Sequence, residues 1–361
     1  MGLFGDNSSR PAIYTLTVIR KSRSFCALIL TAGAIWWSMS AASAAERWVR
    51  AGLTSNSPVW GIKGGLQFAL HPGGFTRGVG GPRGLIRIGY PTLTNGSYDL
   101  INFLAVEPAV KGRKGLSELE KSSIDGRQGK MFWAGEMGTG TNVDLVAGEI
   151  SSPAPGVEQL SVTIAVERFT NGAHVRLKLA QRSDAPDELR VTVEAQPDSK
   201  TIESCVITAT MGNKARARII QLRDGPISCL ELYPDYRGRD FAPHRFFHLS
   251  QLSRTASGDV LVPMMTDEEY PSVVQPFGRP HFWDYRGAKV TQYWRKPAPG
   301  VSENLTCAVN GRFVYWGSRQ PIPGGISFEN FELREPFQSG QTVIFGVTQR
   351  NWRGLIPELK R

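Results

Sequence analysis

The middle of the chain alternates apolar and polar residues in short runs that are separated by turn residues. The alternation covers 160–166 and, after the pair Asn171-Gly172, resumes over 175–179. A period of two is typical of a strand with one dry and one wet face, and Asn-Gly favours a two-residue hairpin turn. Further alternating runs follow at 189–194, 205–210 and 215–219. We therefore predict an antiparallel meander over residues 158–222.

Helical patterns are almost absent outside this region. Only 116–121 has helical character, and a segment of that length does not form a stable helix by itself. The 39 glycines and 23 prolines are spread along the chain, which favours many turns over a flexible linker. The sequence predicts an all-β protein, a large antiparallel β-sandwich of the supersandwich type.

The first 44 residues have the pattern of a secretory signal peptide. Lys21 and Arg23 precede an apolar run over 25–39, and the small residues Ala42-Ser43-Ala44 follow it. A charged segment, a short apolar core and a small-x-small site are what signal peptidase cleavage requires. We expect a secreted or periplasmic protein with no stable membrane span after cleavage, and a retained anchor is the alternative.

The remaining residues, 45–361, are expected to form a single large β-sandwich domain. A stretch rich in Pro and Ser at 151–156 is a candidate sub-boundary. Three cysteines follow the leader, and their spacing matches no zinc pattern. We expect Cys205, Cys229 and Cys307 to be buried and apolar in role, with a Cys205–Cys229 bridge as the alternative.

The net charge of +10 changes the range of expected partners. A basic surface attracts anionic groups such as acidic polysaccharide, phosphate-bearing polymer or lipid headgroups. Nucleic acid is not expected, because the basic residues are scattered singly along strands. A basic surface without any partner is the alternative interpretation.

Two regions are richer in ionisable residues than a strand pattern requires. In the first, 102–136, Glu118 and Glu120 would share a face if the segment were extended. Each carboxylate would then raise the pKa of the other, which is how a carboxyl group stays protonated and acts as a general acid. The alternative is that both glutamates pair with nearby lysines on a solvated loop.

The second region, 231–335, mixes aromatic rings with charged side chains, as a saccharide groove does. Within it we predict Trp294 and Trp316 as stacking platforms for sugar rings. We predict Arg237 and Arg319 as groups that bind a substrate carboxylate. Since Trp and Tyr also fill the cores of β-sandwiches, a structural role is the alternative for these rings.

Histidine supplies the predicted proton carriers, His244 and His281. His281 is close in sequence to Asp284 and Tyr285, which would orient it and contact substrate. His244 and His248 are four residues apart, but Pro243 favours an extended path on which they cannot chelate a metal together. Neither a metal nor a cofactor is expected.

Several common catalytic signatures are missing from the sequence. It contains no Gly-x-Ser-x-Gly, His-Glu-x-x-His, Walker-type Gly-x-x-x-x-Gly-Lys or dinucleotide-binding fingerprint. Their absence argues against the commonest serine hydrolases, zinc peptidases, kinases and nicotinamide-dependent enzymes.

Two late segments, VNGRFVYWGS at 309–318 and GGISFENFE at 324–332, resemble strands of galactose-mutarotase-like proteins. That group includes aldose epimerases, accessory domains of glycosidases and polysaccharide lyases. The resemblance implies a β-supersandwich that handles sugars, with a histidine acid and a late glutamate base. Glu329 or Glu332, paired with His244 or His281, are the nearest counterparts here.

From these features we expect an exported carbohydrate-active protein that cleaves glycosidic bonds by hydrolysis or elimination. Its partner would be a poly- or oligosaccharide, neutral or anionic. The alternative is a non-catalytic glycan-binding or cell-envelope structural protein. The predicted catalytic residues are Glu118, Glu120, His244, His281, Glu329 and Glu332, and the predicted substrate-binding residues are Arg237, Asp284, Tyr285, Trp294, Trp316 and Arg319.

Overall fold

The computed structural model describes residues 47–70, 75, 82–91, 96–135, 146–210, 217–266, 290–315, 319–322, 324–350 and 355. The predicted signal peptide lies outside these residues. Residues 47–361 belong to one compact unit. Within the described part of the chain, no helix has the length and apolar character needed to cross a membrane.

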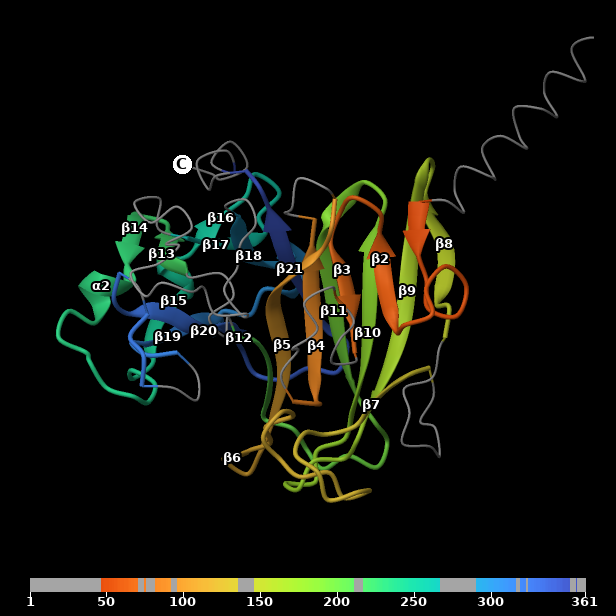
Figure 1. The fold of residues 1–361 in the computed structure, drawn as a ribbon, viewed down its shortest axis with the longest axis horizontal. Coiled ribbons are helices and arrows are strands. Elements are labelled where there is room, and N and C mark those ends of the chain that lie inside the picture. Colours follow the sequence, from red (N-terminus) through yellow and green to blue (C-terminus); the bar gives the residue numbers. More distant parts are fainter. Residues whose placement is uncertain are drawn as a thin grey trace, which may run out of the picture. The chain divides into compact units, whose positions relative to one another are not determined.

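The strand pairings trace two antiparallel layers, which can be followed in Figure 1. We call the first layer sheet A. Its strands, in spatial order, are β1 (Trp48–Val49), β2 (Val59–Ile62), β3 (Gln67–Ala69), β4 (Leu85–Tyr90), β5 (Asp99–Val110), β12 (Ser204–Thr210), β20 (Ser327–Arg334), β19 (Thr306–Arg312) and β15 (Arg245–His248).

The second layer is sheet B. Its strands, in spatial order, are β8 (Glu149–Ala154), β9 (Val157–Val166), β10 (Val175–Arg182), β11 (Ala185–Ala195), β21 (Gln341–Thr348), β18 (Thr291–Lys296), β17 (Val260–Thr266), β13 (Ala217–Leu222) and β14 (Gly225–Ser228). The short strand β7 (Phe132–Ala134) shares the edge of β9 with β8. One residue pair, Ala217 with Phe328, joins sheet B to sheet A.

The remaining elements are small. They are β6 (Arg113–Lys114) on β5, β16 (Ser253–Arg254) on β17, the helix α2 (Cys229–Leu232) and the 3₁₀ turns η1 (Leu249–Gln251) and η2 (Ala298–Gly300). The fold is therefore an all-β antiparallel sandwich, and this prediction from the sequence pattern is confirmed.

The predicted meander is correct for three strands and wrong for the last two. β9, β10 and β11 pair in sequence order, with a turn at Asn171-Gly172 in which Gly172 has a φ of 91°. β12, however, leaves sheet B and pairs with β5 and β20 in sheet A, and β13 pairs with β14 and β17. The alternation of apolar residues marks a strand but does not encode which strand lies beside it. The 151–156 stretch lies at the tip of the β8–β9 hairpin.

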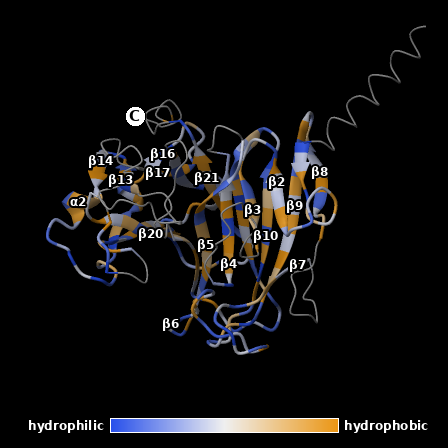
Figure 2. Cartoon of the chain, in the orientation of Figure 1, coloured by the Kyte–Doolittle hydropathy of each residue, from blue (hydrophilic) through white to orange (hydrophobic). Residues whose placement is uncertain are grey.

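The main core fills the space between the two sheets. Trp294 of sheet B packs against Phe331 of sheet A, and its indole NH donates a hydrogen bond of 2.8 Å to the Phe331 carbonyl. Asn102 and Gln292 also join the sheets through a buried hydrogen bond. Figure 2 shows hydrophobic residues along β4 and β5, whereas the solvent-exposed β8 is largely hydrophilic. Cys205, Cys229 and Cys307 are buried free thiols, as the sequence predicts.

A second, smaller core covers part of the outer face of sheet A. Val59, Ala69, Leu85 and Phe103 belong to it, together with Phe75. These side chains point away from the main core because successive residues of a strand alternate between faces. The outer face of sheet A is therefore also packed over β2–β5. The polar residues described next lie beside this second core, on β5, β12 and β20.

Candidate active site

Ionisable side chains gather on the outer face of sheet A where β5, β12 and β20 lie side by side. Val106 and Ile207 point into the main core, so that Glu107 and Thr208, one position further along each strand, face outward. Glu332 lies directly opposite Thr208 on β20. The register of three strands that are far apart in sequence thus brings two carboxyl groups and a hydroxyl together.

Glu332 is the most enclosed member of this group, with 1% of its surface exposed. The Thr208 hydroxyl donates a hydrogen bond of 2.6 Å to Glu332 Oε2, and Arg334 Nε donates one of 2.6 Å to Oε1. His244 Nε2 lies 3.8 Å from the same Oε1. Both oxygens of this carboxylate are therefore held, as is required of a residue that fixes the orientation of a neighbour.

Glu107 connects this carboxylate to Lys114 of β6. Lys114 Nζ lies 3.2 Å from Glu107 Oε2. Burial is the main cause that raises the pKa of Glu107 above 4.5; nearby Glu332 raises it further, while Lys114 and Thr208 lower it. A carboxyl group in this position favours its protonated form.

Glu118 is the second carboxyl group with a raised pKa. Burial, reinforced by the charge of Glu107, raises the pKa of Glu118 from 4.5 to about 7. The turn that carries Glu118 is bonded to β5 just beyond the end of its pairing with β4. Ser117 N donates to the Val106 carbonyl at 3.2 Å, and Val106 N donates to Ser117 Oγ at 2.9 Å. Glu118 thus follows directly after a residue that two hydrogen bonds anchor to β5.

The open side of the cluster is formed by the segment that enters β15. His244 keeps 31% of its side chain exposed and stacks on Phe246, with 6.0 Å between ring centroids. The guanidinium of Arg334 lies 5.3 Å from the centre of the Phe246 ring, which is 49% exposed. Burial is the main cause that lowers the pKa of His244; Arg334 and Lys114 lower it further, whereas Glu332 raises it.

These residues form what we call the Glu118–His244 cluster: Glu107, Lys114, Glu118, Thr208, His244, Phe246, Glu332 and Arg334. At neutral pH it contains a carboxyl group that can donate a proton and an imidazole that can accept one. Two basic side chains stand beside them, where an anionic group of a substrate would be neutralised. Glu118 and His244 are connected through Glu107 and Glu332, and both are groups that acid–base chemistry uses.

Three predicted catalytic residues thus meet here, whereas Glu120 does not join them. Residues 117–119 form a turn instead of an extended strand, so Glu118 and Glu120 do not share a face. Glu120 lies 3.2 Å from Lys130 and accepts a hydrogen bond of 2.9 Å from Thr170 N. The raised pKa of Glu118 therefore comes from burial and Glu107, and the expected pairing with Glu120 is wrong.

The other predicted residues have separate surroundings. Trp294 is 0% exposed between the sheets, so its predicted role as a stacking platform is wrong. Arg237 is exposed, donates to the backbone carbonyls of Pro234 and Tyr236, and lies over the Phe313 ring. Glu329 is buried in β20, and Arg319 is exposed. Four predicted residues, His281, Asp284, Tyr285 and Trp316, lie outside the described residues.

Glu107 and Arg334 are cluster members that the sequence analysis does not predict. Glu107 is the only charged residue of the apolar run LINFLAVEPAV in β5. A charged residue within an otherwise apolar strand indicates a functional or paired position. Arg334 offers no such signal, because it alternates normally at the end of its strand.

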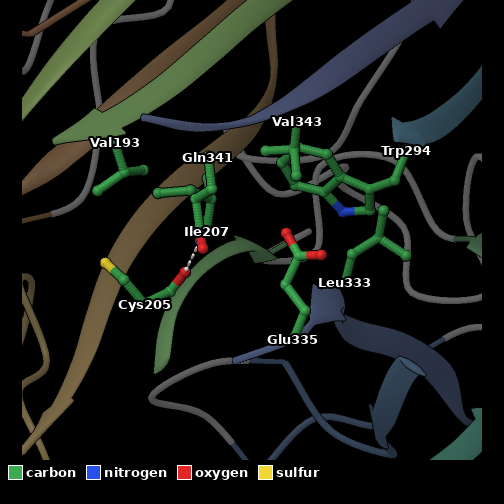
Figure 3. Close-up of a pocket in the computed structure, with 8 residues that line it drawn as sticks. All are labelled: Val193, Cys205, Ile207, Trp294, Leu333, Glu335, Gln341 and Val343. Carbon is green, nitrogen blue, oxygen red and sulfur yellow. Dashed lines mark hydrogen bonds between the residues drawn. The ribbon is translucent and has the colours of Figure 1, made fainter. Parts of the chain in front are cut away.

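A cavity near Glu335, in the interior of the sandwich, is too small for a substrate. Figure 3 shows this cavity, which holds about 10 Å³ and is bordered by Trp294, Glu335 and Gln341. Gln341 donates a hydrogen bond of 2.9 Å to the Cys205 carbonyl across it. The space suits one water molecule at most. Among the described residues, no group of three or more His, Cys, Asp or Glu side chains could hold a metal ion.

Comparison with protein-family models gives no match, and comparison with curated protein sequences gives none either. Among solved structures, the galactosidase domain of the α-galactosidase–sucrose kinase AgaSK is similar to this chain, with a TM-score of 0.36 and 9% sequence identity. The match covers 85% of this chain and 42% of that chain. The chain therefore spans less than half the length of the structure it matches.

Proposed function

We propose that this protein cleaves a glycosidic bond, with Glu118 as the proton donor and His244 as the proton acceptor. The observation that carries the proposal is that Glu118 and His244, from distant segments, are connected through Glu107 and Glu332 on the outer face of sheet A. The surroundings shift the pKa of Glu118 upward and that of His244 downward. Opposite shifts of this kind assign an acid and a base within one site.

In the proposed reaction Glu118 gives its proton to the leaving oxygen of the sugar. His244, whose Nε2 lies 3.8 Å from Glu332 Oε1, takes a proton from water in a hydrolysis or from a ring carbon beside a carboxylate in an elimination. Arg334 and Lys114 would neutralise the carboxylate of an acidic sugar. The exposed face of Phe246 offers an apolar surface on which a sugar ring can stack.

A second candidate, a non-catalytic glycan-binding protein, is favoured by one observation. Phe241 and Phe246 are both large exposed rings, and each is covered on one side by an arginine, Arg312 or Arg334. Rings fixed in this way present a platform for sugars without any chemical step. In this case the polar cluster beneath would serve only to hold the platform in place.

The decisive experiment incubates the purified protein with a panel of neutral and acidic glycans. New reducing ends would show hydrolysis, and ultraviolet absorbance of an unsaturated product would show elimination. We expect Glu118→Gln and His244→Asn each to lose activity by about 100-fold or more, since general acid–base catalysis contributes about 10²–10⁴-fold. The exposed Glu149→Gln is the matched control and should keep full activity.

If no glycan is cleaved but one binds, and Phe246→Ala abolishes that binding, the second candidate holds. If glycans are neither cleaved nor bound, the proposed function fails altogether.

Export belongs to the same proposal, since the pattern around Lys21 and Ala44 predicts cleavage by signal peptidase. N-terminal sequencing of the protein secreted by a bacterial host should give Ala45 as the first residue. A protein that stays in the cell at full length would argue against export.

A further inference from the structure

A second polar site lies on the outer face of sheet B and is independent of the proposed activity. A cavity of about 310 Å³ opens there between β10, β11, β18 and β21. Three of its side chains are basic and two are acidic, and the rest are small or aliphatic. Its walls consist of Ala180, Arg182, Asp184, Ala185, Glu188, Arg190, Arg295 and Ile344, and we call it the Arg190 pocket.

The pocket lies where the β10–β11 hairpin departs from regular pairing. The register shifts between Ala180 and Arg182. The residue between them, Gln181, is buried, and its amide donates to the carbonyls of Leu66 and Pro186 at 2.9 and 2.8 Å. A bulge of this kind twists the strand away from its partner. The outer face is therefore opened at this point while Gln181 is anchored inward.

Arg190 differs from Arg176, on the same face of β10 and β11, because no acid lies opposite it. Its cross-strand neighbours are Ala180 on β10 and Ile344 on β21. Arg176, by contrast, lies opposite Glu194 and donates two hydrogen bonds to it, of 3.0 and 2.5 Å. No hydrogen bond links the half-buried Arg190 side chain to any described residue, so its guanidinium donors are available to a ligand.

The two acids of the pocket are already engaged by other groups. Asp184 receives hydrogen bonds of 2.7 and 2.9 Å from Arg182. Glu188 pairs with Arg295 and accepts a hydrogen bond of 3.0 Å from the Tyr293 hydroxyl. Neither acid is therefore hydrogen-bonded to Arg190, although a carboxylate retains lone pairs that can accept from a ligand hydroxyl.

Two other guanidinium groups, those of Arg295 and Arg182, lie near Arg190, and Asp259 lies 3.6 Å from Arg295. Burial lowers the pKa of Arg190, and nearby Arg295 and Arg182 lower it further, against the opposite effect of Glu188 and Asp259. Arg295 Nε is itself buried without a hydrogen-bond partner among the described residues. An anion placed in the pocket would relieve this repulsion and satisfy the guanidinium donors.

We propose that the Arg190 pocket binds a hydroxylated anion of monosaccharide size, with Arg190 holding its carboxylate or phosphate group. A volume of about 310 Å³ lies at the lower end of the range for small-molecule sites. Asp184 and Glu188 accept hydrogen bonds from hydroxyl groups of the same ligand. Sugar acids and sugar phosphates share this chemistry, a charged oxyanion next to several hydroxyls.

Isothermal titration calorimetry at low ionic strength tests the proposal with three probes: glucuronic acid, glucose 1-phosphate and glucose. We expect at least one of the two anions to bind and neutral glucose to bind at least about tenfold more weakly than that anion. Whichever anion binds more tightly identifies the charged group that the pocket recognises. Equal binding of glucose, or no binding of either anion, overturns the proposal.

Variants locate the binding on the surface of sheet B. Arg190→Gln should weaken anion binding at least about tenfold, whereas Arg176→Gln, on the same face, should leave it unchanged. Circular dichroism and thermal unfolding without ligand show whether Arg190→Gln is folded. Unchanged binding in a folded Arg190→Gln overturns the proposal. Glu118→Gln should bind the anion normally, which separates this result from the proposed catalytic function.

Discussion

Glu118 is a carboxyl group whose charged form is disfavoured by the folded protein. Its pKa rises from 4.5 to about 7 on folding, chiefly by burial. Below pH 4.5 the carboxyl group is protonated in both the folded and the unfolded protein, so its contribution to the free energy of unfolding is fully present. That contribution is lost as the pH rises through about 7, because the unfolded state releases the proton more readily than the folded state. We predict that Glu118→Gln is more stable than the natural protein at pH 8, by on the order of 3 kcal/mol, and nearly equal to it at pH 4.

Urea unfolding at both pH values measures this difference, with Glu149→Gln as the exposed control. If Glu118→Gln changed the free energy of unfolding equally at pH 4 and pH 8, folding would not raise the pKa of this carboxyl group. A residue that lowers stability in its charged form while promoting activity is typical of catalytic sites.

The proposed acid and base set the pH dependence of activity. Glu118 donates a proton only while it is protonated, so kcat/KM should fall as pH rises through about 7. His244 accepts a proton only while it is neutral, and its lowered pKa keeps it neutral to below pH 6.5. A bell-shaped profile with its maximum on the acid side of neutrality is expected. Activity that rises steadily above pH 8 would contradict these roles.

A buried ion pair between Lys296 and Glu335 gives a separate prediction at the residue scale. The side chains are 2% and 7% exposed, and Glu335 borders the small interior cavity. We expect Lys296→Met to destabilise the protein by about 3–5 kcal/mol, because it leaves Glu335 charged and buried. Lys296→Met combined with Glu335→Leu should restore most of that loss. Urea unfolding of both variants checks this, and a double variant no more stable than the single one would contradict it.

Composition located the ionisable residues of the cluster, but their partners depend on tertiary structure. Glu118, His244 and Glu332 were selectable because carboxyl and imidazole groups are the usual proton carriers. The nearness of Glu107 to Glu332 depends on the register of β5 against β12, which the sequence pattern does not encode. Trp294 is predicted as a sugar-stacking residue but fills the core, because residue type alone does not distinguish a buried tryptophan from an exposed one.

Among the elements, β21 has a packing requirement that a single substitution can test. Gly346 lies opposite Tyr293 of β18, and a Cβ atom at this glycine would lie 2.0 Å from the tyrosine ring. We expect Gly346→Ala to destabilise the protein by about 1–3 kcal/mol, since overpacking displaces a ring that is hydrogen-bonded to Glu188. Gly300→Ala, whose Cβ meets only Lys296 at 3.5 Å, is the control. Thermal unfolding measures both, and equal loss would contradict the steric explanation.

Strand existence was predictable at this scale, whereas strand partners were not. The runs at 160–166, 175–179 and 189–194 form three consecutive strands of sheet B. β12 follows β11 after residues 196–203, a connection as long as residues 167–174 between β9 and β10, yet β12 enters sheet A. Connection length therefore does not decide the partner of a strand. Alternation reports which residues are buried, and the burial can be provided by any sheet that has a free edge.

For the molecule as a whole, the sequence predicts the all-β sandwich but does not predict that polar sites lie on the outer faces of both sheets. The Glu118–His244 cluster lies on the outer face of sheet A, and the Arg190 pocket lies on that of sheet B. The main core separates the two, so their effects should be additive. We expect the double variant Glu118→Gln with Arg190→Gln to show the sum of the two single changes in unfolding free energy, within about 0.5 kcal/mol. A larger deviation in urea unfolding would show that the two faces are coupled.

The last strand within the described residues, β21, lies in the interior of sheet B between β11 and β18. During synthesis, the ribosome therefore releases the segment that joins these two parts of the sheet only after nearly all other strands have been made. Until then β11 and β18 each present an open edge that can pair with another chain. Folding of sheet B is expected to be completed after translation, and a nascent chain that stops before Gln341 would be a substrate for chaperones or for aggregation.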